Sequence, residues 1–178
     1  MFAGYGDLDD VETIMKSVRG GWRPLQREEL RDELVHDAYK SQKRPPEPTL
    51  CPDCGAVHRG GRWQWGSAEA GAHTERCPAC QRIHDHFPAG YVTLAGEFLA
   101  SHRDELLHLA RNREAREKAE HPLERIMDVK DVEDGVSITT TGVHLARAIG
   151  DAIHDAYKGK LEYQYNKEEN LLRVHWSR

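Results

Sequence analysis

Four cysteines, arranged as two pairs, are the feature that most constrains how this chain can fold. Cys51 and Cys54 form the first pair, Cys77 and Cys80 the second, and the spacing is C-x2-C-x22-C-x2-C. Each C-x2-C turn directs two sulfurs at a common point, so two such turns supply the four ligands of a tetrahedral zinc ion. The spacer is slightly longer than the usual window of about 15–20 residues, which a longer fingertip accommodates. The sequence therefore predicts one structural Zn²⁺ whose coordination positions are all filled by protein.

Other uses of these cysteines fit the sequence less well. We expect no secretory signal at the acidic N-terminus, and a cytosolic chain keeps its thiols reduced, which favours metal binding over disulfides. A thioredoxin-like redox site needs one C-x-x-C, whereas this motif is duplicated. Nearby histidines could replace a thiolate, but four sulfurs already complete the shell. We therefore expect these histidines at the surface or outside the ligand shell: His58, His73, His84 and His86.

Length and charge limit the class of protein. A chain of 178 residues is long enough for one ordinary domain and a small metal module. The formal net charge of −5 argues against a protein held on nucleic acid by bulk charge alone. Basic residues are nevertheless concentrated between Lys16 and Arg27, where no acidic residue occurs. No apolar run approaches the roughly 20 residues needed to span a bilayer, so we expect a cytoplasmic protein without membrane contact.

The pattern of apolar residues predicts an α+β fold in three parts. Residues 1–48 are expected to form a flexible basic arm, a short helix and a Pro-rich linker, residues 49–90 a zinc ribbon, and residues 91–178 an α+β module. In the ribbon, residues 56–65 are predicted to form a hairpin with Gly60-Gly61 at its turn. The module is predicted as a helix followed by a ββαββ antiparallel sheet with one face covered. The predicted elements are a helix over 96–120, strands over 123–129 and 136–141, a helix over 142–158, and strands over 161–165 and 171–176.

The hairpin carries the richest group of side chains for nucleic-acid binding. Arg59, Arg62 and Trp63 lie close together in the sequence, and arginines beside aromatic rings can bind phosphates while the rings stack on exposed bases. Each such stack contributes on the order of 1–3 kcal/mol. Alternatively, Trp63 or Trp65 packs behind the metal site, because a small ribbon has little other core. Both interpretations stay open at this point.

Catalytic motifs are not evident. His84-Asp85-His86, expected on an extended segment, could chelate a metal, but a third ligand is not found nearby in the sequence. The chain has no phosphate-binding glycine loop and no G-x-S-x-G, and the cysteines are assigned to zinc. We therefore expect neither an enzyme nor a small-molecule substrate.

Together, these segments resemble the large-ribosomal-subunit export adaptor family of archaea and eukaryotes, of which the chain looks like a small bacterial relative. The resemblance rests on the paired knuckles, on 77–83 and 90–98, and on the later turn, strand and helix over 134–138 and 143–157. It covers about residues 50–176. Larger members carry more knuckles than the single four-cysteine site here, so a nuclear-export role is not expected. The resemblance implies binding to the large ribosomal subunit, with the zinc module touching ribosomal RNA.

These observations combine into one functional hypothesis: a ribosome-associated zinc protein that acts in ribosome hibernation or protection, or in maturation of the large subunit. A zinc-ribbon regulator that binds DNA or RNA polymerase is the alternative, and a purely protein-binding adaptor is a third possibility. The residues expected to contact RNA are the basic residues of the arm and the side chains of the zinc module: Lys16, Arg19, Arg23, Arg59, Arg62, Trp63 and Arg82.

Overall fold

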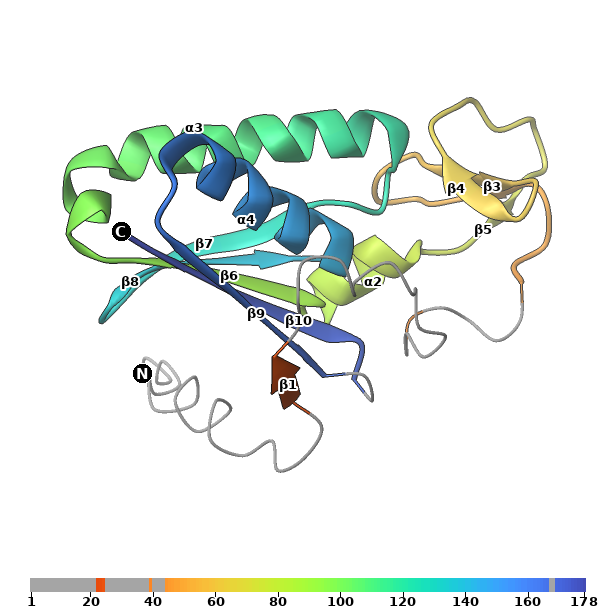
Figure 1. Cartoon of the computed structure of the whole chain (residues 1–178). Coiled ribbons are helices and arrows are strands. Elements are labelled where there is room, and N and C mark those ends of the chain that lie inside the picture. The colour runs from red at the N-terminus through yellow and green to blue at the C-terminus, as the bar shows by residue number, and fades with distance from the viewer. Residues whose placement is uncertain (1–21, 25–38, 40–43, 167–168) are drawn as a thin grey trace, which may run out of the picture.

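The computed structural model describes residues 22–24, 39, 44–166 and 169–178 (Figure 1). This part of the chain is α+β, with three helices and two mixed sheets. Lys16, Arg19 and most of the short helix expected after the arm lie outside the described residues. The helices are α2 (Pro78–His84), α3 (Glu97–Glu120) and α4 (Val143–Tyr157).

The larger sheet has six strands in the order β1-β9-β10-β6-β8-β7. Its strands are β1 (Trp22–Pro24), β6 (Gly90–Ala95), β7 (Ile126–Val132), β8 (Gly135–Thr140), β9 (Lys160–Asn166) and β10 (Leu171–Ser177). Neighbouring strands are antiparallel except β10 and β6, which run parallel. Strands β6 and β7 flank β8 and are joined through α3, which is a split β-α-β arrangement.

The expected antiparallel sheet is therefore wrong in one respect: the sheet is mixed. Its four expected strands and the covering helix are all present, close to the predicted boundaries. However, β6 lies at the centre between β8 and β10, where the prediction placed no strand, and it pairs in parallel with β10. A further strand, β1, comes from the expected arm, because Arg23 pairs across the sheet edge with Tyr165. Alternation of apolar and polar residues marks β6, but the strand begins at the glycine of a Pro-Ala-Gly sequence that is typical of the end of a module.

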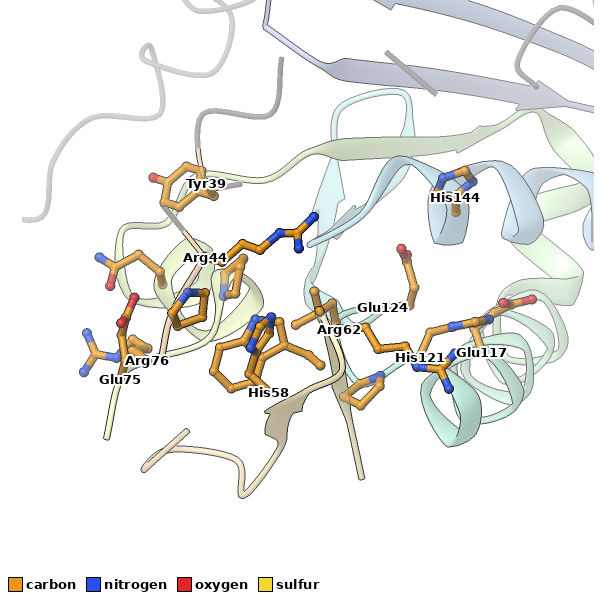
Figure 2. A pocket seen from close by; sticks show the side chains of 17 residues that line it. Tyr39, Arg44, His58, Arg62, Glu75, Arg76, Glu117, His121, Glu124 and His144 are labelled. Carbon is orange, nitrogen blue, oxygen red and sulfur yellow. The ribbon is translucent and has the colours of Figure 1, made fainter. Parts of the chain in front are cut away.

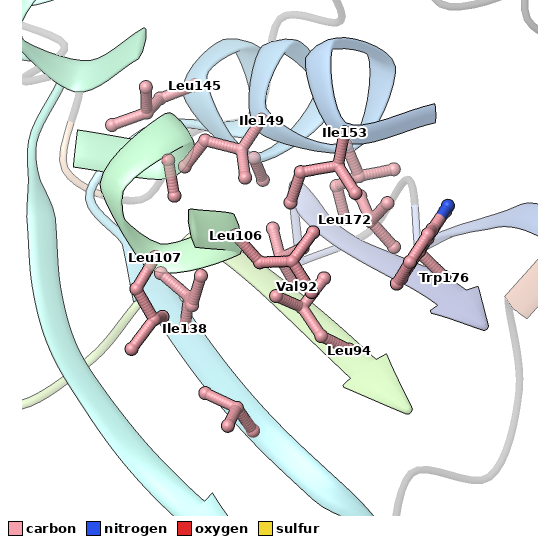
Figure 3. Close-up of a cluster of buried hydrophobic side chains, with 14 of the residues drawn as sticks. Val92, Leu94, Leu106, Leu107, Ile138, Leu145, Ile149, Ile153, Leu172 and Trp176 are labelled. Atoms are coloured by element: carbon pink, nitrogen blue, oxygen red, sulfur yellow. The ribbon is translucent and has the colours of Figure 1, made fainter. Parts of the chain in front are cut away.

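Helices α3 and α4 lie on the same face of this sheet and enclose the core (Figures 1 and 3). Helix α4 presents a fully buried stripe, Leu145, Ile149 and Ile153, because these residues recur every four positions. Burying each side chain of this size contributes about 1.5–3 kcal/mol. The stripe packs on side chains from the central strands and from α3, namely Val92, Leu94, Ile138, Leu172, Trp176, Leu106 and Leu107.

Gly90, the first residue of β6, allows α4 to approach the sheet closely. A Cβ atom at this position would lie 2.4 Å from the Cβ of Ala146 and 2.5 Å from Oγ1 of Thr140. Contacts this short require a neighbouring atom to move, and both neighbours are buried. The glycine therefore sets the distance between β6 and the first turn of α4.

The smaller sheet has the order β4-β3-β2-β5 and belongs to the ribbon. Its strands are β2 (Thr49–Leu50), β3 (Val57–Arg59), β4 (Arg62–Gln64) and β5 (His73–Thr74). The expected hairpin is confirmed: β3 and β4 are antiparallel and joined by Gly60-Gly61, whose φ values of 62° and 76° suit glycine. In the described residues, no helix is both long enough and apolar enough to cross a membrane.

Candidate metal centre

The four cysteine sulfurs converge at one point between the smaller sheet and α2. Cys51 directly follows β2, and Cys77 and Cys80 lie at the start of α2. All four Sγ atoms lie within 4.8 Å of one another, and the Sγ atoms of Cys54 and Cys77 are 3.8 Å apart. Tetrahedral coordination at a Zn–S distance of about 2.3 Å requires sulfurs about 3.8 Å apart. The four thiols can therefore hold a metal ion, as the spacing predicted.

Local backbone geometry positions these sulfurs. The N–H of Gly55 donates to the carbonyl of Cys51 (2.9 Å), which closes the first turn. In the second turn, Cys77 caps the N-terminus of α2, and its sulfur accepts the backbone N–H of Cys80 at 3.5 Å. The N–H of Cys77 in turn donates to the sulfur of Cys51 at 3.3 Å. The N–H groups of Cys77 and Cys80 direct partial positive charge at the sulfurs, which favours the thiolate form that binds metal.

A buried arginine from another part of the chain completes the surroundings of the sulfurs. The guanidinium of Arg125 donates to the Sγ of Cys80 at 3.2 Å and approaches the Sγ of Cys77 at 3.9 Å. Its side chain is held by a further bond from Nε to the carbonyl of Pro122, 2.7 Å away. Arg125 is 8% exposed, so its charge is removed from water and directed at the sulfurs. Four thiolates around a divalent ion carry a net charge of −2, which this cation partly compensates.

Arg125 is fixed in place by the larger sheet. Its backbone N–H donates to Oγ1 of Thr141 (2.9 Å), and its carbonyl accepts the backbone N–H of Thr141 (2.9 Å). Leu123, two residues earlier, packs against the cysteine cluster. The segment between α3 and β7 therefore joins the metal site to the α+β body. The sequence prediction missed the roles of Arg125 and Leu123 at the cysteines. Arg125 lies 45 residues after Cys80 in the sequence, and only the tertiary fold brings the two side chains into contact.

The protonation of the thiols reflects this mixture of burial and positive charge. Burial alone would raise the pKa of Cys54, but the N–H of Ala56 and the guanidinium of Arg125 outweigh it and lower the pKa to about 7. Burial raises the pKa of Cys80 to about 11, although Arg125 opposes the change. Burial and the neighbouring sulfurs raise the pKa of Cys77 well above its usual value. Four thiolates this close together repel one another, so a bound cation is needed to keep all four ionised.

The predicted RNA-contacting arginines of the hairpin are at its exposed tip. Arg59 and Arg62 face each other across the turn, and both are exposed. The turn itself is held by Glu47, whose carboxylate accepts the backbone N–H groups of Gly60 (2.9 Å) and Gly61 (2.8 Å). These two N–H groups, first Gly61 and then Gly60, hold the pKa of Glu47 below its usual value. The linker thus orders the turn that presents the arginines.

Both tryptophans near the tip make contacts that fix the hairpin, although Trp65 is 39% exposed. Trp63 is half-buried, packs against the cysteine cluster and makes an edge contact with the His58 ring at 5.4 Å. This agrees with the packing interpretation of the sequence. Trp65 donates from Nε1 to the carbonyl of Lys118 at 2.6 Å, which ties the hairpin to the end of α3.

Arg82 is not available for the RNA contact expected of it. Its side chain is 2% exposed, its guanidinium donates to the carbonyl of Phe87 at 3.1 Å, and it lies 4.4 Å from the centre of the Tyr39 ring. A residue of the second knuckle was expected at the surface, but α2 turns Arg82 inwards. His58 was also expected at the surface or outside the shell, and at 4% exposure it is a buried residue.

His84 and His86 do not form a chelating pair on an extended segment. His84 is the last residue of α2, and its Nδ1 lies 2.9 Å from a carboxylate oxygen of Asp85. His86 follows with φ of 52°, so the two rings do not share the alternating geometry of a strand. The side-chain hydrogen bonds from His84 and Gln81 lower the pKa of Asp85 to about 2. Among the described residues, the four cysteines are the group that could hold a metal ion.

A groove of about 960 Å³ separates the ribbon from the α+β body (Figure 2). Its walls are the hairpin, the start of α2, the linker at Arg44 and Pro45, and the segment Pro122–Glu124 after α3. The half-buried carboxylate of Glu124 accepts the backbone N–H of Leu145 at 3.0 Å and so caps α4. Burial raises the pKa of Glu124, although His144 and the N–H of Leu145 oppose the shift.

Comparison of the chain with models of known protein families, with curated proteins and with solved structures found no significant match.

Proposed function

We propose that the metal is Zn²⁺ and that its role is structural. The donor set is four thiolates, which are the ligands typical of closed zinc sites. Protein sulfurs occupy all four positions of such a site, and the arginine that faces them is a hydrogen-bond donor rather than a ligand. A site of this kind leaves no position for water or substrate, so it would order the hairpin and α2 instead of activating a reactant.

The function that this arrangement supports best is RNA binding by a zinc-stabilised hairpin. The observation that carries the proposal is the pair of exposed arginines, Arg59 and Arg62, opposite each other at the tip of a hairpin built on the cysteine cluster. Two guanidinium groups on an ordered turn can bind phosphate oxygens with little loss of conformational freedom. The net charge of −5 then limits binding to this local basic surface, so affinity should fall steeply with salt.

Within this proposal, the RNA is ribosomal and the protein associates with the large subunit. The choice of the ribosome rests on the resemblance of the knuckles and the following α+β segments to the large-subunit export adaptors. Growth phase would then decide the role, because hibernation factors accumulate on ribosomes of stationary cells and maturation factors on subunits of growing cells.

Sucrose-gradient sedimentation of the tagged protein tests the proposal. We expect comigration with large subunits or whole ribosomes at low salt and release at high salt. The double substitution Arg59→Ala/Arg62→Ala should move the protein to the top of the gradient. A matched control is Arg111→Ala/Arg116→Ala, which removes two exposed arginines from α3 and should leave sedimentation unchanged.

Three results would contradict the proposal. Wild-type protein found only at the top of the gradient would exclude ribosome association. Equal loss in the tip and control variants would mean that total charge, and not the hairpin, is responsible. Enrichment on DNA without ribosomes would instead favour the transcriptional regulator.

A further inference from the structure

The groove between the ribbon and the α+β body is lined by arginines and aromatic side chains, several of which are not part of the hairpin tip. At about 960 Å³ it is at the upper end of the range for ligand sites, roughly 300–1,000 Å³. It meets the hairpin tip at Arg62 and extends beyond it, to the linker and to the segment after α3. Figure 2 shows Arg44 reaching it from the linker and Arg62 from the hairpin.

The acidic side chains of the groove already have partners. Glu117 pairs with Arg113 at 2.9 Å, and Glu124 accepts the N–H of Leu145. Glu75 lies 3.8 Å from a ring nitrogen of His73. The charge of Glu117 is therefore compensated by a cation of the protein, and Glu124 and Glu75 each have a polar contact.

Of the three arginines that line the groove, two have no ion pair with an acidic side chain in the described part of the chain. Arg76 forms an ion pair with Asp53. By contrast, neither Arg44 nor Arg62 has a hydrogen bond or a close ion pair for its guanidinium in the described part of the chain. Arg44 and Arg62 are thus the two arginines of the groove whose guanidinium groups can accept a ligand without breaking a bond. His58 adds a ring nitrogen, Nδ1, that is buried and makes no hydrogen bond, with the nearest Glu47 oxygen at 3.5 Å.

We propose that this groove binds the backbone of single-stranded RNA, with Arg44 and Arg62 each contacting a phosphate. The inference rests on the proposed RNA-binding function and extends it from the hairpin tip into the groove. RNA fits better than an acidic peptide, because aromatic rings lie in the wall beside the arginines, at Trp63 and Tyr39. Rings beside guanidinium groups match bases and phosphates on one strand, whereas a carboxylate-rich peptide needs only the charges.

The positions of the three arginines define the path that a bound RNA strand would take. Arg59 marks the tip of the hairpin, Arg62 lies at the entrance shared by tip and groove, and Arg44 lies on the linker side. A strand that contacts all three crosses the ribbon close to the cysteine cluster, since Trp63 lines the groove and packs on that cluster. Binding in the groove should accordingly require the metal.

The experiment measures binding of a fluorescently labelled single-stranded RNA of about 10 nucleotides to the full chain across a range of salt concentrations. The slope of log K against log salt is negative, and its magnitude should fall by about 0.7 for each phosphate that the protein no longer neutralises. We expect this decrease for Arg44→Ala and recovery of the slope in Arg44→Lys, which keeps the charge. Arg116→Ala, exposed on α3 and outside the groove, is the matched control and should keep the wild-type slope.

The outcomes separate this inference from the proposed function. If Arg59→Ala weakens binding and Arg44→Ala does not change the slope, RNA binding by the tip stands and the groove assignment is wrong. If wild-type protein binds no RNA, the proposed function itself fails. If polyglutamate displaces the RNA in wild-type protein but no longer binds Arg44→Ala, the groove accepts acidic chains in general and the assignment to RNA is overturned.

Discussion

Replacing Arg125 tests most sharply how the fold supports the metal site. The variant Arg125→Met keeps a long apolar stem but removes the guanidinium that donates to Cys80 at 3.2 Å. The contact with Cys77, at 3.9 Å, is too long to count as a second full hydrogen bond. The perturbation therefore removes one charge-assisted bond to a sulfur of the candidate site, the positive charge beside it, and the bond from Nε to the carbonyl of Pro122.

The expected loss of Zn²⁺ affinity follows from the removal of the hydrogen bond to Cys80. A hydrogen bond to a charged group contributes about 1.5–3 kcal/mol. Since about 1.4 kcal/mol corresponds to a factor of ten, Zn²⁺ affinity should fall by roughly 10- to 100-fold. This is also the usual cost of removing a residue hydrogen-bonded to a metal ligand.

The assay is competition for Zn²⁺ against a chromophoric chelator of known affinity, with circular dichroism as a check on folding. The control Arg103→Met removes an arginine whose ion pair with Asp131 (2.7 Å) lies at the surface, and it should leave the metal affinity unchanged. If the folded Arg125→Met protein binds Zn²⁺ as tightly as wild type, the guanidinium does not stabilise the thiolates and the reasoning is refuted.

Three further predictions concern Glu124, Gly90 and the contact between the ribbon and the α+β body. Burial raises the pKa of Glu124 above its ordinary value of 4.5, so the stability of wild type relative to Glu124→Gln, measured by urea titration, should decrease as pH rises from 4.5 through the raised pKa; equal pH profiles would contradict this. Glu124→Ala, which lacks the bond to the N–H of Leu145, should lose about 0.5–2 kcal/mol. Gly90→Ala should cost about 1–3 kcal/mol in the same assay, against no change for Gly66→Ala, which has open space around it; matching values would be inconsistent with the close approach of α4. Chelation should remove amide-exchange protection from residues 49–88 and also from 121–125, and full protection of the latter would argue that the ribbon is independent.

The elements with strong periodicity could be predicted from the sequence. The helix over 142–158 and the hairpin at Gly60-Gly61 are present at the predicted places, because the apolar stripe of the helix and the turn residues of the hairpin are local patterns. The cysteine cluster was equally predictable, since two C-x2-C turns each fix their own geometry. In each case, the signal lies within a short stretch of chain.

What depended on the tertiary fold could not be predicted. The parallel pairing of β10 with β6 joins segments about 80 residues apart, and no local pattern specifies it. The inward turn of Arg82 depends on α2, which begins at Pro78 directly after its N-cap, Cys77. Arg125 reaches the sulfurs only because the sheet holds the connection after α3 against the ribbon.

X-ray absorption at the zinc edge on the purified full chain tests most directly the central claim that the four cysteines hold one structural Zn²⁺. The account predicts one Zn²⁺ per chain surrounded by four sulfurs at about 2.3 Å. A shell containing nitrogen or oxygen ligands, or protein that folds without stoichiometric metal, would contradict it.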